Sequence, residues 1–308
     1  MAPLRFGSRG PSEDQQSAAA IDLQRIREGG IPLGAEQRLE RVGAAKTPFF
    51  TSDLSVKEYA LAQASGLQPI AQVMGSSVVR HGRKQWRTGR FEQGFTEELT
   101  SWSDPWNVAR TRAFERLRVE ATLAGADAVI GIELSSESVD ADGSQLEYAV
   151  FGTAARETTL AASGPGRPQL STLSGQDVDK LRRIGAGICE VVGHTTVLLV
   201  GRKAPASWTM GGSRGGNQEL TEISTGMYEA RRLLMTEIER QAAERGANDV
   251  VVTTLRHRVA HHAVEQGAPN QQYFVITMHL LGTGLRLGAH EPHPAPLRTP
   301  TMSIDLRG

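Results

Sequence analysis

Cysteine is almost missing from this sequence. The 308 residues include one, Cys189, so the chain can form no internal disulfide and no thiolate cage for a metal ion. Long apolar runs are missing as well, since no stretch approaches the ~20 residues that a membrane-spanning helix needs. Residues 1–20 also lack the apolar core of a signal peptide. We therefore expect a cytoplasmic protein without a membrane partner.

The sequence has no excess of charge of either sign, because 34 Lys and Arg balance 34 Asp and Glu. This balance removes the long-range attraction that nucleic-acid-binding proteins usually show. The basic stretch Arg80–Arg90 could stack on a single strand, but acidic residues follow it within 92–104. We therefore expect no nucleic-acid partner, and we predict that Trp86, Trp102 and Trp106 lie at a subunit contact.

Catalytic signatures are missing too. The sequence contains no GxSxG, no phosphate-binding GxxxxGK and no pair of carboxylates that acid–base chemistry would require. Cys189 lies in the apolar run Ile188–Val192, where a thiol behaves as a small hydrophobic group. We predict that the protein is not an enzyme.

Internal repetition is the strongest positive feature. FGTAAR (Phe151–Arg156) returns as LGTGLR (Leu281–Arg286), and GADAVIG (Gly125–Gly131) returns as GANDVVV (Gly246–Val252). Further matches are Gly66–Val79 with Gly185–Leu199, and Asp53-Leu54-Ser55 with Thr172-Leu173-Ser174. The order is the same in both copies, which predicts a duplicated unit with insertions in its loops.

Each copy contains one predicted helix. Apolar residues spaced by three and four form its buried face: Phe114, Leu117, Ala121 and Ala124 in one copy, and Met227, Ala230, Leu234, Ile238 and Ala242 in the other. Each helix runs into a glycine, Gly125 or Gly246, which suits a helix end. Ser103 or Asp104, with Pro105 after them, predicts the start of the first helix.

Strands surround each predicted helix. One precedes it, at 70–79 or 188–200, and two follow it; in the first copy Ala128, Ile130, Ile132 and Leu134 are expected on one strand face. The sequence therefore predicts an α+β fold of two β-α-β-β domains, each a small antiparallel or mixed sheet covered by one helix. Such a sheet leaves one face open, so we expect self-association.

Composition sets the predicted domain boundaries. We expect a flexible N-terminal segment at 1–46, the first copy at 47–158, a Gly/Pro linker at 159–170, the second copy at 171–287, and a disordered Pro-rich tail at 288–308.

Four stretches of the first copy, FTSDLSV (Phe50–Val56), VMGSSVV (Val73–Val79), GADAVIGI (Gly125–Ile132) and FGTAAR, resemble the YbjQ-like family, which carries a heavy-metal-binding label. The resemblance covers residues 48–157 and, more loosely, 171–287. It implies tandem dodecin-like units that assemble into a pentameric ring, with no reaction attached. The sequence departs from the family label because it offers no cysteine-rich metal site.

Histidines supply the candidate metal site. His257 and His261 point to one side of an extended strand, and His279 lies on the next strand. Imidazole ligands suit zinc, copper or nickel. The alternative interpretation is a solvated hairpin end, because Arg256 and Arg258 flank the first histidine and oppose a dication.

The C-terminal stretch MSIDLRG (Met302–Gly308) resembles the short tails that load cargo into bacterial encapsulin shells. Ile304, Leu306 and Arg307 could dock in a groove of such a partner while the Pro-rich segment gives reach. The alternative is a disordered terminus. Two functions stay open: a non-enzymatic, ring-forming homo-oligomeric scaffold that binds a metal ion or small ligand at subunit contacts, or an interaction module whose tail recruits a protein partner.

Overall fold

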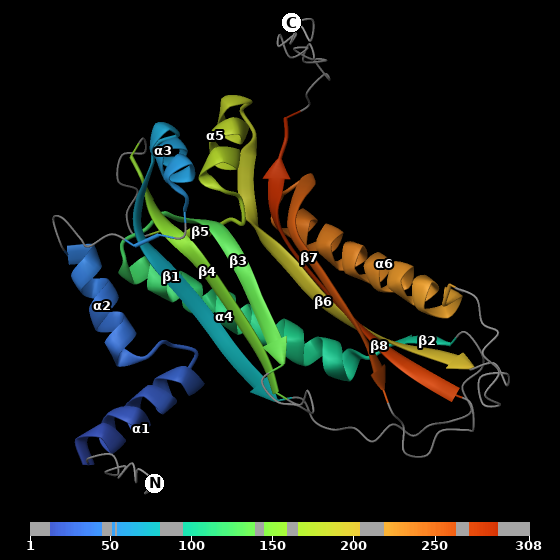
Figure 1. Ribbon diagram of the computed structural model, residues 1–308. Helices are drawn as coiled ribbons and strands as arrows, with labels where there is room; N and C mark the ends of the chain where they lie inside the picture. Colours follow the sequence, from blue (N-terminus) through green and yellow to red (C-terminus); the bar gives the residue numbers. More distant parts are fainter. Residues whose placement is uncertain are drawn as a thin grey trace, which may run out of the picture.

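The computed structural model of the protein describes residues 13–44, 51–52, 54–80, 95–138, 145–158, 166–203, 219–262 and 271–288 (Figure 1). Two four-stranded sheets and their helices make an α+β fold, as predicted. None of the helices in these ranges combines the length and the hydropathy that a membrane crossing requires.

The first half (residues 51–158) and the second half (residues 166–288) each contain a short helix, a long strand, a long helix and two strands. In the first half these are α3 (Val56–Ala64), β1 (Leu67–Arg80), α4 (Thr100–Leu123), β3 (Ala128–Ser138) and β4 (Gln145–Glu157), with a short strand β2 (Thr96–Glu98) before α4. In the second they are α5 (Gly175–Arg183), β6 (Gly187–Lys203), α6 (Thr221–Glu244), β7 (Asp249–His262) and β8 (Gln271–Arg286), with a short strand β5 (Gln169–Leu170) before α5.

The short helices begin in the same way, because a serine precedes each. The Ser55 hydroxyl accepts a hydrogen bond from the Glu58 amide (3.3 Å), and the Ser174 hydroxyl accepts one from the Asp177 amide (3.2 Å). Such N-caps satisfy amides that the first helical turn leaves open.

The long helices bury the faces that their apolar spacing predicted. Leu117 and Ala121 of α4, and Leu234 and Ile238 of α6, are fully buried. Both helices end at the predicted glycines, Gly125 and Gly246, whose φ angles of 71° and 69° lie in the left-handed region.

The three long strands of each half have the same order in both sheets. β4 lies between β1 and β3, and β8 lies between β6 and β7, with all of these pairs antiparallel. The repeated hexapeptides therefore end the two central strands. The fourth strand of each sheet comes from the other half: β5 runs parallel to β3, and β2 pairs antiparallel with β6. The halves thus exchange short strands.

The layers are arranged so that α4 has two sheets to cover. One apolar cluster joins Ala113 and Leu117 of α4 to Val73 of β1, and also to Val197 and Leu281 of the second sheet. The helix α6 covers the opposite face of that second sheet (Figure 1). The prediction of one helix per sheet is therefore wrong for the second half, whose sheet has a helix on each face.

The N-terminal segment was predicted to be flexible over 1–46, but residues 13–44 form two helices, α1 (Glu13–Arg27) and α2 (Leu33–Ala44). Ile31 and Leu39 are buried in the same cluster as α4, and the Arg116 guanidinium of α4 donates to the carbonyl of Ile26 (2.9 Å). The helical pattern of this segment is too weak to predict the two helices from the sequence. Their stability comes from a few apolar contacts with α4 and not from helix propensity.

The long helix α4 starts earlier than predicted. It begins at Thr100, so that Pro105 lies inside it. Ser103, the predicted cap, instead turns its hydroxyl to the second half, where it accepts a hydrogen bond from the Val197 amide (3.0 Å). The Leu99 amide, just before the helix, donates to the Val197 carbonyl (2.8 Å). Contacts with the second half therefore fix this helix start.

Two further expectations need correction. A bulge in β3 between Ile130 and Glu133, at which Gly131 takes a φ of 63°, breaks the predicted alternation. Ile130 therefore joins the cluster of α3 and α5, whereas Ile132 and Leu134 join the cluster of α4. The linker predicted at 159–170 contributes residues 169–170 to the first sheet as β5.

Candidate functional site at the interface between the halves

The inter-half interface, formed by α4 against β6 and β8, holds a polar cluster. Asn107 of α4 makes two hydrogen bonds with the backbone of Thr195 on β6. Its side-chain amide donates to the Thr195 carbonyl (2.9 Å), and its side-chain carbonyl accepts from the Thr195 amide (3.1 Å). These paired bonds fix the position of α4 along the strand of the other half.

His279 lies in the same interface, where the ring of Trp106 packs edge-on against it with a centroid distance of 4.7 Å. Its Nδ1 is 2.9 Å from the hydroxyl of Thr195. Burial, and secondarily the charge of Arg256, lowers the pKa of His279 to about 4. His279 is therefore a neutral interior residue at physiological pH.

The predicted histidine trio does not come together. His257 and His261 pair with Met278 and Phe274 of β8, which face α6, and the His261 ring contacts Phe274. His279 points to the opposite face, toward α4. In the part of the chain that the structure describes, no three His, Cys, Asp or Glu side chains gather as a metal ion requires, so these residues do not fit the predicted site.

The other predicted contact residues have separate outcomes. Trp106 is buried and Trp102 is half-buried, and both lie in the cluster between the halves. The predicted subunit contact is thus a contact within one chain. Trp86 and the tail residues Ile304, Leu306 and Arg307 lie outside the described residues.

The second half has surfaces that correspond to those of the inter-half interface, but they are not covered in the same way. At the offset that aligns Gly125 with Gly246, Ile130 of β3 corresponds to Val251 of β7. Residues 170–173 lie along β3: the Ser171 amide donates to the Val129 carbonyl (2.9 Å), and the Gly131 amide donates to the Leu173 carbonyl (2.8 Å). Ile130 is 2 % exposed under this cover, whereas Val251 is 37 % exposed.

The outer sides of the sheets and helices show the same inequality. No strand within the described ranges lies beyond β1 or β7. Leu134 of β3 is 3 % exposed, and its counterpart Leu255 of β7 is 49 % exposed. Tyr228 of α6 corresponds to Asn107 of α4, yet it is 75 % exposed. Surfaces that are covered in the first half are therefore exposed at the corresponding positions of the second half.

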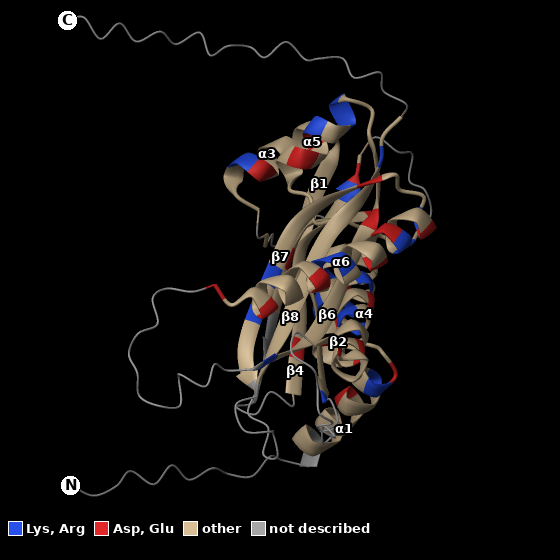
Figure 2. Ribbon diagram, turned by 90° about the vertical axis from the view of Figure 1, so that its right-hand side faces the viewer, with Lys and Arg blue, Asp and Glu red and all other residues tan. Residues whose placement is uncertain are grey.

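The outer surface of α6 carries no excess of one sign of charge that would indicate one class of ligand. Basic and acidic residues are interspersed along α6 (Figure 2), where Arg232 pairs with Glu229 and Arg240 pairs with Glu237, both at 2.6 Å. Such pairs between exposed side chains of one helix are screened by solvent and contribute little to stability.

No sequence pattern predicted the exchanged strands, because β2 has three residues and β5 has two. One signal was nevertheless present. Leu99 and Leu220 precede the two long helices at matching positions, and they adopt nearly the same backbone conformation (φ −88° in both; ψ 75° and 80°). An apolar residue at a cap position, where polar residues are preferred, indicates a tertiary contact.

Comparison with known proteins shows the family of the chain. A YbjQ family model described as "Putative heavy-metal-binding" matches residues 56–158. The "Encapsulin nanocompartment protein Rv1762c" of Mycobacterium tuberculosis (strain ATCC 25618 / H37Rv) is 32% identical over 216 residues, which are 69% of this chain and 79% of that protein. A UPF0145 protein of Alkaliphilus metalliredigens (strain QYMF) is 37% identical over 91 residues, 29% of this chain and 85% of that protein. Neither relative is named as an enzyme, and the chain belongs to the YbjQ-like (UPF0145) family.

Proposed function

We propose that the protein is a non-enzymatic scaffold that associates head to tail with copies of itself and closes into a ring. The observation that carries the proposal is the one-sided inter-half interface. The first half gives α4 and β2 to the second half and receives β5 from it. The corresponding surfaces of α6, β7 and β1 are left for a neighbouring copy, because a duplicated unit carries the same complementary surfaces twice.

The contact between copies follows from the contact within one chain. Ser52 and Leu54 correspond to Ser171 and Leu173, and both pairs share a local hydrogen bond: the Leu54 amide donates to the Ser52 hydroxyl (2.9 Å), and the Leu173 amide donates to the Ser171 hydroxyl (3.1 Å). Ser52 and Leu54 of one copy would lie along β7 of the next and cover Val251. The outer face of α6, including Tyr228, would cover the first sheet of that neighbour.

The contact is heterologous, so it propagates until the rotation between copies closes a ring. Each chain contributes two halves, so a ring in which both halves take part contains an even number of halves. The family resemblance implies rings of five single units; a ring of five whole chains would contain ten halves and have a mass of five times 33.2 kDa, or 166 kDa.

Native mass spectrometry with multi-angle light scattering tests the proposal. We expect the full chain to form one closed oligomer, and Val251→Lys with Leu255→Lys to reduce it to single chains without changing its circular dichroism. Leu23→Lys, at another exposed leucine on α1, is the matched control and should leave the oligomer intact. A wild-type protein that is monomeric at micromolar concentration contradicts the proposal.

A second candidate function rests on the relative named as an encapsulin nanocompartment protein. We propose that residues 302–308 attach the oligomer to an encapsulin shell, since their sequence combines apolar residues with an arginine at the end of a Pro-rich segment. The test is co-expression with the encapsulin shell protein of the same organism, followed by isolation of the shells. The full chain should co-purify inside shells, and a chain with residues 302–308 scrambled should not. Equal loading of both contradicts this function.

A further inference from the structure

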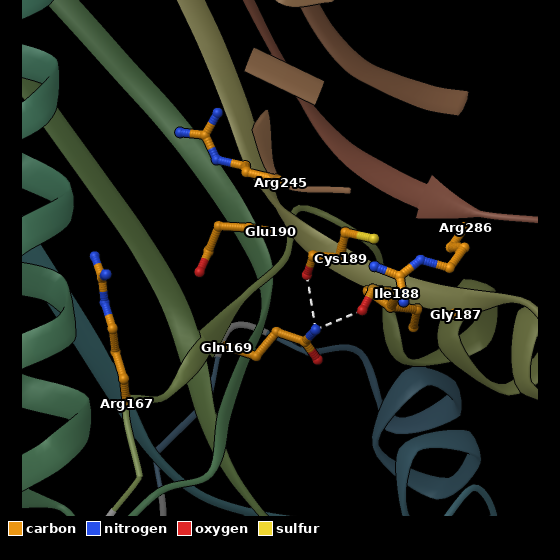
Figure 3. A pocket seen from close by; sticks show the side chains of 8 residues that line it. All are labelled: Arg167, Gln169, Gly187, Ile188, Cys189, Glu190, Arg245 and Arg286. Carbon is orange, nitrogen blue, oxygen red and sulfur yellow. Dashed lines mark hydrogen bonds between the residues drawn. The ribbon is translucent and has the colours of Figure 1, made fainter. Parts of the chain in front are cut away.

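A cavity of about 360 Å³ opens at one end of the inter-half interface, where β5 meets β6 (Figure 3). Most of its charged lining residues are arginines; the lining residues are Arg167, Gln169, Gly187, Ile188, Cys189, Glu190, Arg245 and Arg286. Figure 3 shows Arg167 and Arg245 on one side of Cys189 and Arg286 on the other.

Glu190 is the only carboxylate among the described residues that line the cavity, and its oxygens already have partners. One oxygen accepts from the Arg118 guanidinium (3.0 Å), and the other accepts from the amides of Leu170 (3.1 Å) and Val191 (3.2 Å). Glu190 therefore compensates Arg118, behind the cavity.

The three lining arginines have no such partner. In the described part of the chain, Arg167, Arg245 and Arg286 form no ion pair. Arg286 and Arg245 use one nitrogen each on carbonyl oxygens of Gly246 and Gln241 (both 3.0 Å), which leaves other N–H groups of each fork for a ligand. Burial lowers the pKa of Arg245; the carboxylates of Glu190 and Glu244 oppose this shift, and the charges of Arg240 and Arg167 add to it.

The arginine cluster is not a general property of this fold. The C-cap residue that follows α6 is Arg245, but the C-cap residue that follows α4 is Ala124. The bulge of β6 holds Cys189 and Glu190, whereas the bulge of β1 holds Ile70. The first half keeps one of these charges, since Arg156 stands where Arg286 does, but it has no arginine at the position of Arg245. The fold therefore does not require Arg245, whose placement calls for another explanation.

We propose that this cavity binds a doubly charged oxyanion, either a phosphate group or a dicarboxylate of a small molecule. Planar guanidinium forks match the paired oxygens of both groups, and charge-assisted hydrogen bonds of this kind are about twice as strong as neutral ones. Arg167 and Arg245 supply the binding groups, and Arg286 adds charge from the opposite side. A bound anion would also join β5 to the second half and so stabilise the inter-half interface.

Cys189 makes the test direct, because it is the one cysteine of the chain and lines the cavity. The rate at which a thiol reagent labels Cys189 reports occupancy, and the melting temperature gives a second readout. We expect inorganic phosphate at millimolar concentration, compared with chloride at equal ionic strength, to slow labelling severalfold and to raise the melting temperature.

The variant Arg167→Ala with Arg245→Ala should bind phosphate at least tenfold more weakly. We expect it to fold, because alanine stands at the position of Arg245 in the first half. Arg41→Ala, at an exposed arginine on α2, is the matched control and should bind as the wild type does. Succinate in place of phosphate identifies the class of anion, by whichever protects better. The proposal is overturned if neither anion affects labelling or melting, or if the double variant binds as well as the control. The result does not depend on oligomer formation, since the cavity lies within one chain.

Discussion

Arg156 and Arg286 stand 130 residues apart and make the same contact. The guanidinium Nε of each donates a hydrogen bond to the carbonyl of the glycine that ends the long helix of its own half, at 3.3 Å to Gly125 and 3.0 Å to Gly246. The carbonyl groups at a helix C-terminus have no partner in the helix and carry negative potential, so an arginine is well placed there. This contact accounts for the arginine of the repeated hexapeptide.

We predict that Arg156→Ala lowers the free energy of unfolding by at most about 1 kcal/mol, because the hydrogen bond is lost from an exposed site. Chemical denaturation measures the change. Arg156→Lys keeps the charge near the helix end and should recover part of the loss. A variant as stable as the wild type would show that water replaces the guanidinium at no cost.

Gly75 should tolerate no side chain. A Cβ atom there would lie 1.8 Å from the carbonyl oxygen of Ala113 on α4. We expect Gly75→Ala to destabilise the protein by about 3 kcal/mol or to prevent folding, since α4 must move away from β1. Gly34→Ala is the control, because a Cβ at Gly34 meets nothing within 4 Å; there the melting temperature should stay level or rise slightly. Similar melting temperatures for both variants would refute the close packing of α4 on β1.

Stability should fall on acidification because of His279. Its pKa is about 4 in the folded chain and about 6.5 when unfolded. Below pH 6.5 the imidazole is protonated in the unfolded chain but stays neutral in the folded chain. The free energy of unfolding therefore decreases as the pH falls from 6.5 to about 4. The loss attributable to this residue is on the order of 3 kcal/mol.

Urea denaturation at pH 7.5 and pH 4.5 measures the effect of His279, with His279→Gln as the comparison. The variant should be less stable at pH 7.5 but should lose less stability between the two pH values. An equal pH dependence in both proteins would assign the acid sensitivity to other groups.

Asn107 should contribute strongly to the inter-half interface. Asn107→Ala removes both hydrogen bonds to the Thr195 backbone, and we expect a loss of about 2 kcal/mol in the free energy of unfolding. Thr236→Ala, which removes an exposed contact within α6, should change it by less than about 0.5 kcal/mol. If the two variants are equally stable, the contact of α4 with β6 is not maintained by this side chain.

Local sequence signals predicted the parts of the fold that depend on local physics. Apolar spacing located the buried faces of α4 and α6, and Gly125 and Gly246 marked the helix ends because few other residues adopt a left-handed backbone at low cost. The repeated hexapeptide identified β4 and β8 as matching strands.

The remaining features depend on contacts between distant segments. Nothing in the sequence near Ser103 indicates that its hydroxyl accepts a hydrogen bond from the amide of Val197, 94 residues away. Likewise the bulge in β7 at Thr253 and the strand pairing decide which sheet face a histidine occupies, so His279 is separated from His257 although both lie on neighbouring strands. Spacing along the sequence indicated the type of ligand but could not indicate the sheet face.

The central position of β8 in its sheet affects how the chain can fold during translation. This strand lies in the middle of the second sheet but is made after β6 and β7, and α4 with Trp106 is made before all three. A nascent chain stalled before residue 271 would hold β6 and β7 without the strand that joins them. Folding of the second half therefore has to wait until residues 271–286 have been made, and we expect a chaperone that shields α4 during elongation to raise the yield of native protein.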